Sequence, residues 1–240
     1  MELYLNNSSI ENNKYFKTHK ELLNISNKEI QKIKEYKLKS GFLKNGNKKL
    51  GKLIYSFDLP AVVSCPNSST CFKDCYANKG TFLWGGKGAK TSNTYNFAIA
   101  LNDVKYLESE LIKEIEKKKI KSIRIHSSGD FFSKEYFLMW CNIAKQFKDI
   151  NIFTYSKTPQ IEGIKIPSNL NIIKSIIKYN NENYLNYGTY KDMKNLAKNI
   201  KGLLCPITKG NYLNNDKLKS LTCSICKYCI TKQKPTFVQH

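Results

Sequence analysis

Seven of the eight cysteines fall into two short stretches of the chain, and thiol groups at such spacings can bind a metal ion or an iron–sulfur cluster. The first stretch carries three of them and the second carries four: Cys65, Cys71 and Cys75, then Cys205, Cys223, Cys226 and Cys229. The residues between Cys65 and Cys71 are polar and turn-forming, which predicts a loop. Because a loop lets several thiolates converge on one small volume, we expect one or two metal centres.

The first group has the spacing C-x5-C-x3-C and offers three thiolates. Three thiolates can hold a [4Fe–4S] cluster and leave one iron open to a substrate or a cofactor. A structural or redox role for these cysteines is the alternative. We favour metal ligation.

The second group ends in the spacing C-x2-C-x2-C and offers four thiolates, which suit a closed site. This spacing favours a second [4Fe–4S] cluster, because ferredoxin-like runs use it, and a structural zinc ion is the alternative. The segment has little hydrophobic periodicity and is not expected to form a hydrophobic core of its own. A bound metal would then stabilise its fold. Ligand sharing between the two groups stays open. Cys141, next to Trp140 in an apolar helical pattern, is expected in the core.

Length and composition indicate one sizeable globular domain of 240 residues. No apolar run approaches the roughly 18 residues of a membrane span, and the N-terminus lacks the basic and apolar segments of a signal peptide. We therefore expect a cytoplasmic protein without membrane association. In that compartment clustered cysteines bind metals more often than they form disulfides.

A formal net charge of +21 favours an anionic partner, with nucleic acid or a nucleotide as the first choice. Arg124 is the only arginine, although arginine is the better residue for bidentate contacts to phosphate or guanine. Abundant lysine, asparagine and isoleucine are also typical of an AT-rich genome, which offers a second origin for the charge.

Hydrophobic patterning predicts an α/β fold, because short apolar strands alternate with amphipathic helices. Expected strands are 52–57, 120–126, 151–155 and 170–177, with a short edge strand at 234–238; expected helices are 27–36, 92–101, 103–118, 133–147 and 193–200. We divide the chain into a variable N-terminal extension (1–50), an α/β core with the cysteine loop (51–204) and a cysteine-rich metal-binding segment (205–240).

Three polar turns follow predicted strands: the Cys65 loop, Ser127–Asp130 and Ser156–Lys157. Carboxyl ends of parallel strands share one edge of a sheet, so these turns are expected to face one mouth. His126, Asp130 and Lys157 are the candidate catalytic residues there. Their alternatives are a hydrogen-bonded structural histidine, a helix cap and a solvated lysine.

Several motifs in fixed order resemble the phage gene product 88 family over residues 52–240: F-D-L-P-A at 57–61, C-P-x4-C-x3-C-Y-A from Cys65, I-R-I-H-S-S-G-D-F-F-S-x-E-Y at 123–136, F-T-Y-S-K at 153–157 and the late cysteines. That family looks in turn like a distant relative of the radical S-adenosylmethionine enzymes. The resemblance implies a partial (β/α) barrel with a parallel sheet and a cluster loop after the first strand.

The same resemblance implies a cofactor site for S-adenosylmethionine. Tyr76 matches the aromatic residue beside the adenine, and Ser128, Gly129 and Asp130 match the turn that holds the amino group. Arg124 is expected to pair with a buried acid or a cofactor carboxylate. The pattern departs from C-x3-C-x2-C, because Asn78 stands where the third cysteine is typical and Cys65 must replace it.

The sequence therefore supports two hypotheses for the function. One is a radical-enzyme-like iron–sulfur protein that acts on nucleic acid or a nucleotide. The other is a non-catalytic, metal-stapled module that binds nucleic acid or a protein, in which Ser128–Asp130 is only a tight turn.

Overall fold

The computed structural model describes residues 3–5, 17–47, 49–66, 75, 77, 86–174, 178–179, 182–183, 194–195, 203–206, 209, 213–227, 229 and 235–236. Cys71 and Tyr76, two of the predicted site residues, lie outside these ranges. So does most of the predicted helix at 193–200, of which only 194–195 is described as helical.

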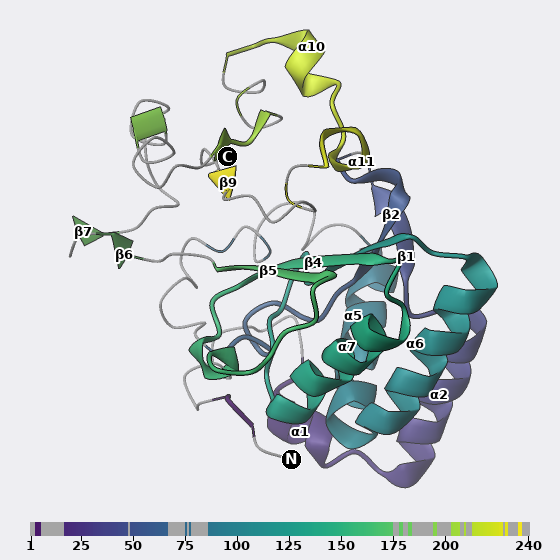
Figure 1. The fold of residues 1–240 in the computed structure, drawn as a ribbon. Coiled ribbons are helices and arrows are strands. Elements are labelled where there is room, and N and C mark those ends of the chain that lie inside the picture. The colour runs from purple at the N-terminus through teal and green to yellow at the C-terminus, as the bar shows by residue number, and fades with distance from the viewer. Residues whose placement is uncertain are drawn as a thin grey trace.

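A five-stranded sheet forms the centre of the protein, in the order β1-β2-β3-β4-β5 (Figure 1). Its strands are β1 (Lys44–Asn47), β2 (Gly51–Phe57), β3 (Ser122–Ile125), β4 (Asn151–Ser156) and β5 (Leu170–Lys174). β1 is antiparallel to β2, and the other neighbours are parallel. Two smaller pairs are β6 (Lys178–Tyr179) with β7 (Glu182–Asn183), antiparallel, and β8 (Leu203–Leu204) with β9 (Pro235–Thr236), parallel.

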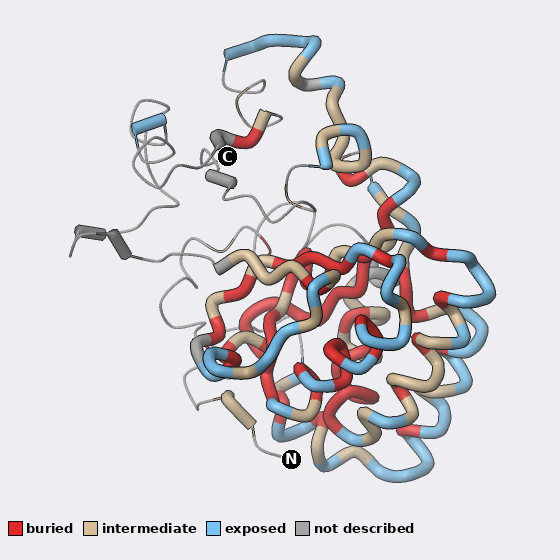
Figure 2. The backbone as a smooth tube through the Cα atoms, viewed as in Figure 1, coloured by how far each residue is buried: buried red, intermediate tan, exposed pale blue. Residues whose placement is uncertain are grey.

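One face of the sheet is covered by helices, which Figure 1 shows together on one side. They are α1 (His19–Leu23), α2 (Asn27–Ser40), α5 (Gly86–Asn102), α6 (Val104–Lys118) and α7 (Lys134–Gln146); η4 (Pro159–Ile161), α10 (Asp216–Lys219) and α11 (Cys223–Cys226) are short. Strand residues at alternate positions, such as Ile123 and Ile125, join the main core with Leu111 of α6 and Trp140 of α7. Figure 2 shows this buried layer between the sheet and the helices.

Local sequence signals account for the helix boundaries. Ser26 and Glu29 form a capping box in which each side chain accepts a hydrogen bond from the other's backbone amide. Ser133 caps α7 by accepting the amide of Tyr136 at 3.2 Å, and Asp103 caps α6 by accepting the amide of Tyr106. The predicted α/β class and the parallel arrangement of strands β2 to β5 are confirmed.

Two features were not expected. β1 adds an antiparallel edge strand, and α5 begins at Gly86 rather than near residue 92. The partial barrel stays a prediction, because β1 and β5 lie at opposite ends of the strand order as described. The segment predicted as an N-terminal extension contributes to the main core through Leu22, Ile30 and Phe42, so its described residues are part of the same packed unit.

Within the described ranges, no helix has both the length and the apolar character needed to cross a lipid bilayer.

Candidate functional site

Asp58 and Asp130 are buried carboxylates that join neighbouring strand ends. Asp58 directly follows β2, and its Oδ1 accepts the amide of Ser127, just after β3, at 2.7 Å. Its Oδ2 accepts the hydroxyl of Ser56 at 3.2 Å and lies 3.7 Å from the ammonium of Lys44 on β1. The carboxylate therefore links the carboxyl ends of β2 and β3 to the edge strand.

Asp130 makes the corresponding link from β3 to β4. Its Oδ1 accepts the amide of Phe131 at 2.8 Å and the hydroxyl of Ser156 at 2.7 Å, and its Oδ2 accepts the amide of Lys157 at 2.8 Å. Burial raises the pKa of Asp130, and these hydrogen bonds oppose that shift. Both carboxylate oxygens of Asp130 accept hydrogen bonds from the protein. In the described structure, Asp130 thus holds together the polar turns at the carboxyl ends of β3 and β4.

Ser128 and Gly129 complete the turn between the two carboxylates. The Ser128 hydroxyl donates to the carbonyl of Leu59 at 2.6 Å and accepts from the amide side chain of Asn93 at 3.3 Å. Gly129 has φ +85°, and a Cβ there would lie 2.6 Å from both Leu59 Cβ and Ser64 Oγ. Only glycine fits this position, because both the backbone conformation and the space exclude a side chain.

His126 is held as a neutral, buried imidazole at the end of β3. Its Nε2 lies 2.8 Å from the hydroxyl of Tyr136, and its ring meets that of Phe131 edge-on at 4.8 Å. Burial, with a smaller effect from Arg124, lowers the pKa of His126 to about 3. Nδ1 is buried and has no hydrogen-bond partner among the described residues. The backbone of His126 has φ 62°, a left-handed conformation that is uncommon for residues other than glycine.

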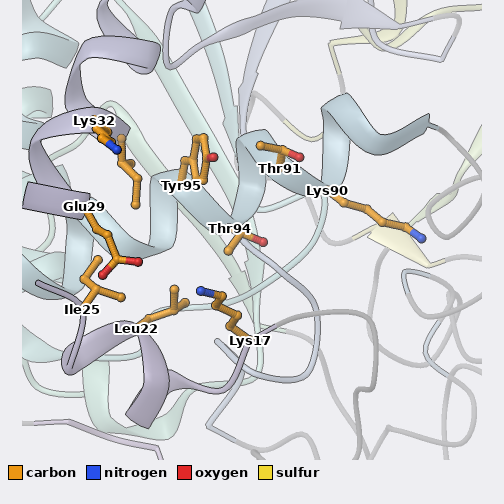
Figure 3. A pocket seen from close by; sticks show the side chains of 10 residues that line it. Lys17, Leu22, Ile25, Glu29, Lys32, Lys90, Thr91, Thr94 and Tyr95 are labelled. Atoms are coloured by element: carbon orange, nitrogen blue, oxygen red, sulfur yellow. The ribbon is translucent and has the colours of Figure 1, made fainter.

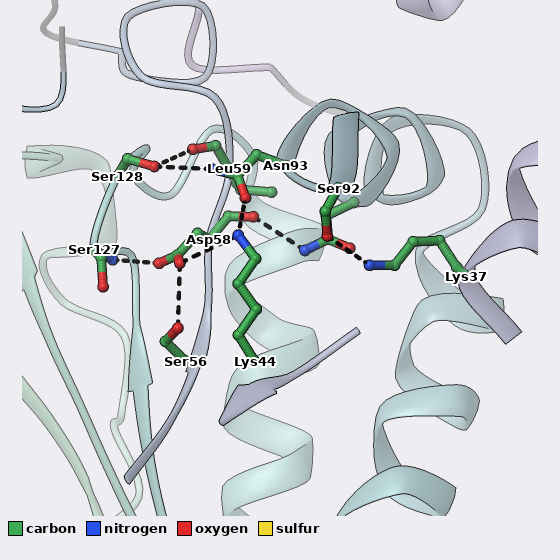
Figure 4. A network of polar contacts seen from close by, with 10 residues as sticks. Lys37, Lys44, Ser56, Asp58, Leu59, Ser92, Asn93, Ser127 and Ser128 are labelled. Carbon is green, nitrogen blue, oxygen red and sulfur yellow. Dashed lines mark hydrogen bonds and ion pairs between the residues drawn. The ribbon is translucent and has the colours of Figure 1, made fainter. Parts of the chain in front are cut away.

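Two lysines that the sequence patterns did not single out belong to the polar contacts around Asp58 and Asn93, Lys44 directly and Lys37 at the neighbouring Ser92 (Figure 4). Lys37 of α2 is fully buried, and its Nζ donates to the Ser92 hydroxyl at 3.0 Å. Lys44 donates to the side-chain carbonyl of Asn93. Burial, with a smaller effect from Lys44, lowers the pKa of Lys37 to about 7. In a chain with 40 basic residues, no sequence signal distinguishes these two from solvated lysines.

The first cysteine group starts on a tight turn after β2. The amide of Cys65 donates to the carbonyl of Val62 at 3.0 Å, and Cys75 packs against a small cluster of Ala61, Val62 and Ala77. Val62 has φ 71°, which is unfavourable for a β-branched residue. Cys65 and Cys75 thus both lie against one turn, Cys71 lies outside the described residues, and the three-cysteine site stays a prediction.

Two of the late cysteines, Cys223 and Cys229, lie on the other face of the sheet, away from the helices. The amides of Cys223 and Ser224 donate to the carbonyls of Lys49 and Leu50, at 2.8 and 3.1 Å. Cys223 and Cys229 pack against Leu50, Ile54 and Phe153, which form a second buried cluster. Figure 1 shows α11 beside β2 on this side. The cysteine-rich segment therefore covers sheet surface that would otherwise be exposed.

These cysteines are close enough to influence one another electrostatically. Burial and the neighbouring thiolates Cys205, Cys223 and Cys226 raise the pKa of Cys229 to about 11. Burial raises the pKa of Cys223 as well, with Arg124 opposing it and Cys205 and Cys226 adding to it. None of the seven described cysteines forms a disulfide. The donor set suits a thiolate-bound metal, although no three described Cys, His, Asp or Glu side chains are close enough, as they stand, to hold one ion.

Arg124 lies with this second group and away from the turn that was predicted to hold a cofactor. Its guanidinium carbon is 5.4 Å from the ring centre of Tyr155. Because Arg124 and Phe153 pair in register on neighbouring strands, both side chains point to the face that carries the cysteines. At the carboxyl ends of the strands, the backbone amide of Lys157 donates a hydrogen bond to Asp130.

A separate hollow of about 370 Å³ lies between α1, α2 and α5 (Figure 3). Its lining is rich in lysine, threonine and aliphatic residues: Lys17, Leu22, Ile25, Glu29, Lys32, Ile33, Lys90, Thr91, Thr94 and Tyr95. Three lysines against one glutamate make the lining positively charged.

Comparisons with known proteins point to one phage family. The family described as "Gene product 88" matches residues 21–224. The chain is 32% identical over 126 residues to "Gene 88 protein" of Mycobacterium phage D29, which covers 48% of this chain and 51% of that protein. It is 31% identical over 126 residues to "Gene 88 protein" of Mycobacterium phage L5, which covers 48% and 52%. The chain thus spans about half the length of the curated relatives it matches, and no solved structure matches.

Proposed function

The chain belongs to the gene product 88 family of phage proteins, and from the arrangement of its cysteines we propose that it is an iron–sulfur protein. Cys65, Cys71 and Cys75 would hold one [4Fe–4S] cluster at the carboxyl edge of the sheet. Cys205, Cys223, Cys226 and Cys229 would hold a closed centre on the opposite face from the helices.

One observation carries this proposal most directly. Cys223 and Cys229 pack against the same buried cluster on the sheet, and no described cysteine forms a disulfide. A bound cation stabilises the deprotonated form of cysteines held in one region and compensates their charge. An iron–sulfur cluster or a zinc ion supplies that compensation, and the spacing of the last three favours iron.

The first cysteine group is the part of the protein where catalysis is proposed. In radical S-adenosylmethionine enzymes, the cofactor bound at an open iron supplies a carbon radical that removes hydrogen from a substrate. Here the turn before Cys65 brings Cys75 close to the end of β2, where the polar turns of β3 and β4 also lie. Fixed, buried turns of this kind can orient a substrate and exclude water.

The turn at Ser128–Asp130 does not fit the role of holding the cofactor's amino group in its described state. The Ser128 hydroxyl and carbonyl both have partners, and both Asp130 oxygens accept hydrogen bonds from the protein itself.

Nucleic acid or a nucleotide is the proposed partner. The net charge of +21 supports an anionic ligand, and the hollow beside Tyr95 offers lysine ammonium groups next to hydroxyl groups and an aromatic ring. These are the groups that contact phosphates and stack on bases.

The second candidate is a non-catalytic, metal-stapled module that binds nucleic acid or protein. The side chains of Ser128 and Asp130 form hydrogen bonds within the protein, which favours this second function. In it, these side chains only join strand ends. In that case the cysteines stabilise the fold, and the lysine-lined hollow carries the binding.

The deciding experiment is anaerobic purification followed by visible spectroscopy and by iron, sulfide and zinc analysis. Iron and sulfide in matched amounts, reduced by Cys75→Ala and by Cys226→Ala, would support two clusters. Calorimetric titration of the iron-loaded protein with S-adenosylmethionine then separates the candidates, because only the catalytic one predicts binding. A colourless protein with stoichiometric zinc, unchanged by cluster reconstitution, would exclude the iron–sulfur proposal.

A further inference from the structure

Tyr155 contacts the last cysteine of the late group directly. Its hydroxyl donates a hydrogen bond to the sulfur of Cys229 at 2.7 Å. The side chain reaches that sulfur because residues of β4 alternate between the two faces, so Phe153 and Tyr155 both point away from the helices. A phenol hydroxyl is a hydrogen-bond donor, and a cysteine sulfur is an acceptor.

Cys229 is also held through its backbone. The side-chain amide of Asn171, on β5, donates to the carbonyl of Cys229. Asn171 pairs in register with Phe153, so it projects from the same face of the sheet as Tyr155. Two neighbouring strands thus fix the sulfur and the backbone of one cysteine.

The other end of the C-x2-C-x2-C run is fixed by the turn before β2. The amides of Cys223 and Ser224 donate to the carbonyls of Lys49 and Leu50. A Cβ on Gly51 would lie 2.3 Å from Ser224 Oγ, so the absence of a side chain there allows the close approach. The run is therefore anchored at both ends to the sheet.

Arg124 provides the positive charge at this place. Its guanidinium lies against the Tyr155 ring, and it is the only arginine of the chain. Arg124 pairs in register with Phe153, so it projects from the face of the sheet on which Cys223 and Cys229 pack. A fixed cation beside several thiolates is the arrangement expected next to an anionic metal–thiolate centre.

We propose that Tyr155 is a positioning residue of the late cysteine centre, which donates a hydrogen bond to the metal-bound sulfur of Cys229, with Asn171 fixing the backbone and Arg124 supplying charge. This inference rests on the proposed metal centre. Hydrogen bonds to cluster sulfurs withdraw electron density, so the reduced cluster is favoured and the reduction potential rises. At a zinc centre the same bond would slow loss of the metal.

The test compares Tyr155→Phe with Tyr55→Phe in the full chain, purified without oxygen. Both changes remove one phenol oxygen, but Tyr55 of β2 packs on the helix-covered face. We expect Tyr155→Phe to retain iron and to shift one reduction midpoint, followed by electron paramagnetic resonance, to a more negative potential. Tyr55→Phe should match the wild type. Unchanged midpoints in Tyr155→Phe, with wild-type iron content, would overturn the inference.

A second measurement, the rate of metal loss, tests the inference when the reduction potential cannot be measured. If the centre holds zinc, or if Tyr155→Phe holds too little iron for the titration, the rate of metal loss to a chelator is measured. Loss several-fold faster than from Tyr55→Phe supports the inference, and equal rates overturn it. The proposed function fails separately, when the wild-type protein itself holds neither iron nor zinc.

Discussion

Asp130 accepts the backbone amide of Lys157 at 2.8 Å and thereby ties the end of β3 to the end of β4. The residue in this position was expected to act through its carboxylate and the lysine through its ammonium. In the structure, the two are joined through the lysine's main chain, and the carboxylate also accepts hydrogen bonds from Phe131 and Ser156.

Asp130→Asn should destabilise the protein by about 1–3 kcal/mol. The NH2 group of asparagine replaces one carboxylate oxygen and would face a hydrogen-bond donor, so at least one hydrogen bond is lost. Urea unfolding measures the free-energy change. Asp149→Asn, at an exposed position before β4, is the matched control and should change stability little. Unchanged stability combined with loss of ligand binding would instead favour the functional role first expected for Asp130.

Gly129→Ala and Gly163→Ala form a second matched pair, since both glycines have positive φ, +85° and +81°. Alanine in this conformation costs about 1–2 kcal/mol at either position. Only at Gly129 would the new methyl group also meet Leu59 and Ser64 at 2.6 Å, whereas nothing lies within 4 Å at Gly163. Thermal unfolding should show the larger loss for Gly129→Ala. Equal losses would mean that the turn relaxes easily.

Lys37 should make the protein more stable as the pH rises. Its pKa is about 7 in the folded protein against 10.5 for an ordinary lysine, so between these values the unfolded chain binds a proton that the folded chain does not. The free energy of unfolding then increases by up to about 1.4 kcal/mol per pH unit, and this contribution is lost as the pH falls through 7. Urea unfolding at several pH values should give a smaller slope for Lys37→Met than for the wild type. An identical slope would show that Lys37 is charged when folded.

His126 should stay neutral well below its usual range. With a folded pKa of about 3 against 6.5, its contribution to stability is present above pH 6.5 and is lost as the pH falls towards 3. Nuclear magnetic resonance of the imidazole nitrogens should show no titration of His126 between pH 7 and about pH 4.5. The signal is assigned by its absence from His126→Asn. Titration near pH 6.5 would restore His126 as a candidate acid at the strand end.

Metal removal should loosen the late cysteine segment and leave the sheet intact. The segment contributes few buried apolar residues of its own, whereas β2 to β4 share the main core with the helices. Chelation, or Cys226→Ser, should increase amide hydrogen exchange in residues 213–227 with little change in β3 and β4. Cys141→Ala is the control, because Cys141 is buried in the main core and should not affect metal content. Equal exchange with and without metal would argue against a metal staple.

Local patterns in the sequence were sufficient for the elements that form the scaffold. Alternating apolar residues predicted β2, β3 and β4, and the capping residues Ser26 and Ser133 predicted the starts of α2 and α7. These signals lie within a few residues of each other, so they can be recognised without knowing the fold. β1 was missed because Lys44–Asn47 carries no apolar alternation, and its pairing with β2 decides its conformation.

The sequence by itself determined the class of fold, the two groups of cysteines and the polar turns that follow the strands. Tertiary structure alone decided how those residues are used. It buried Asp58 and Asp130 as links between strands, made Lys37 an interior amine, and placed Arg124 beside the late cysteines rather than at the mouth. The physical reason is that burial, hydrogen-bond partners and the face on which a side chain lies depend on contacts between distant segments, such as Tyr155 with Cys229, which no local pattern encodes.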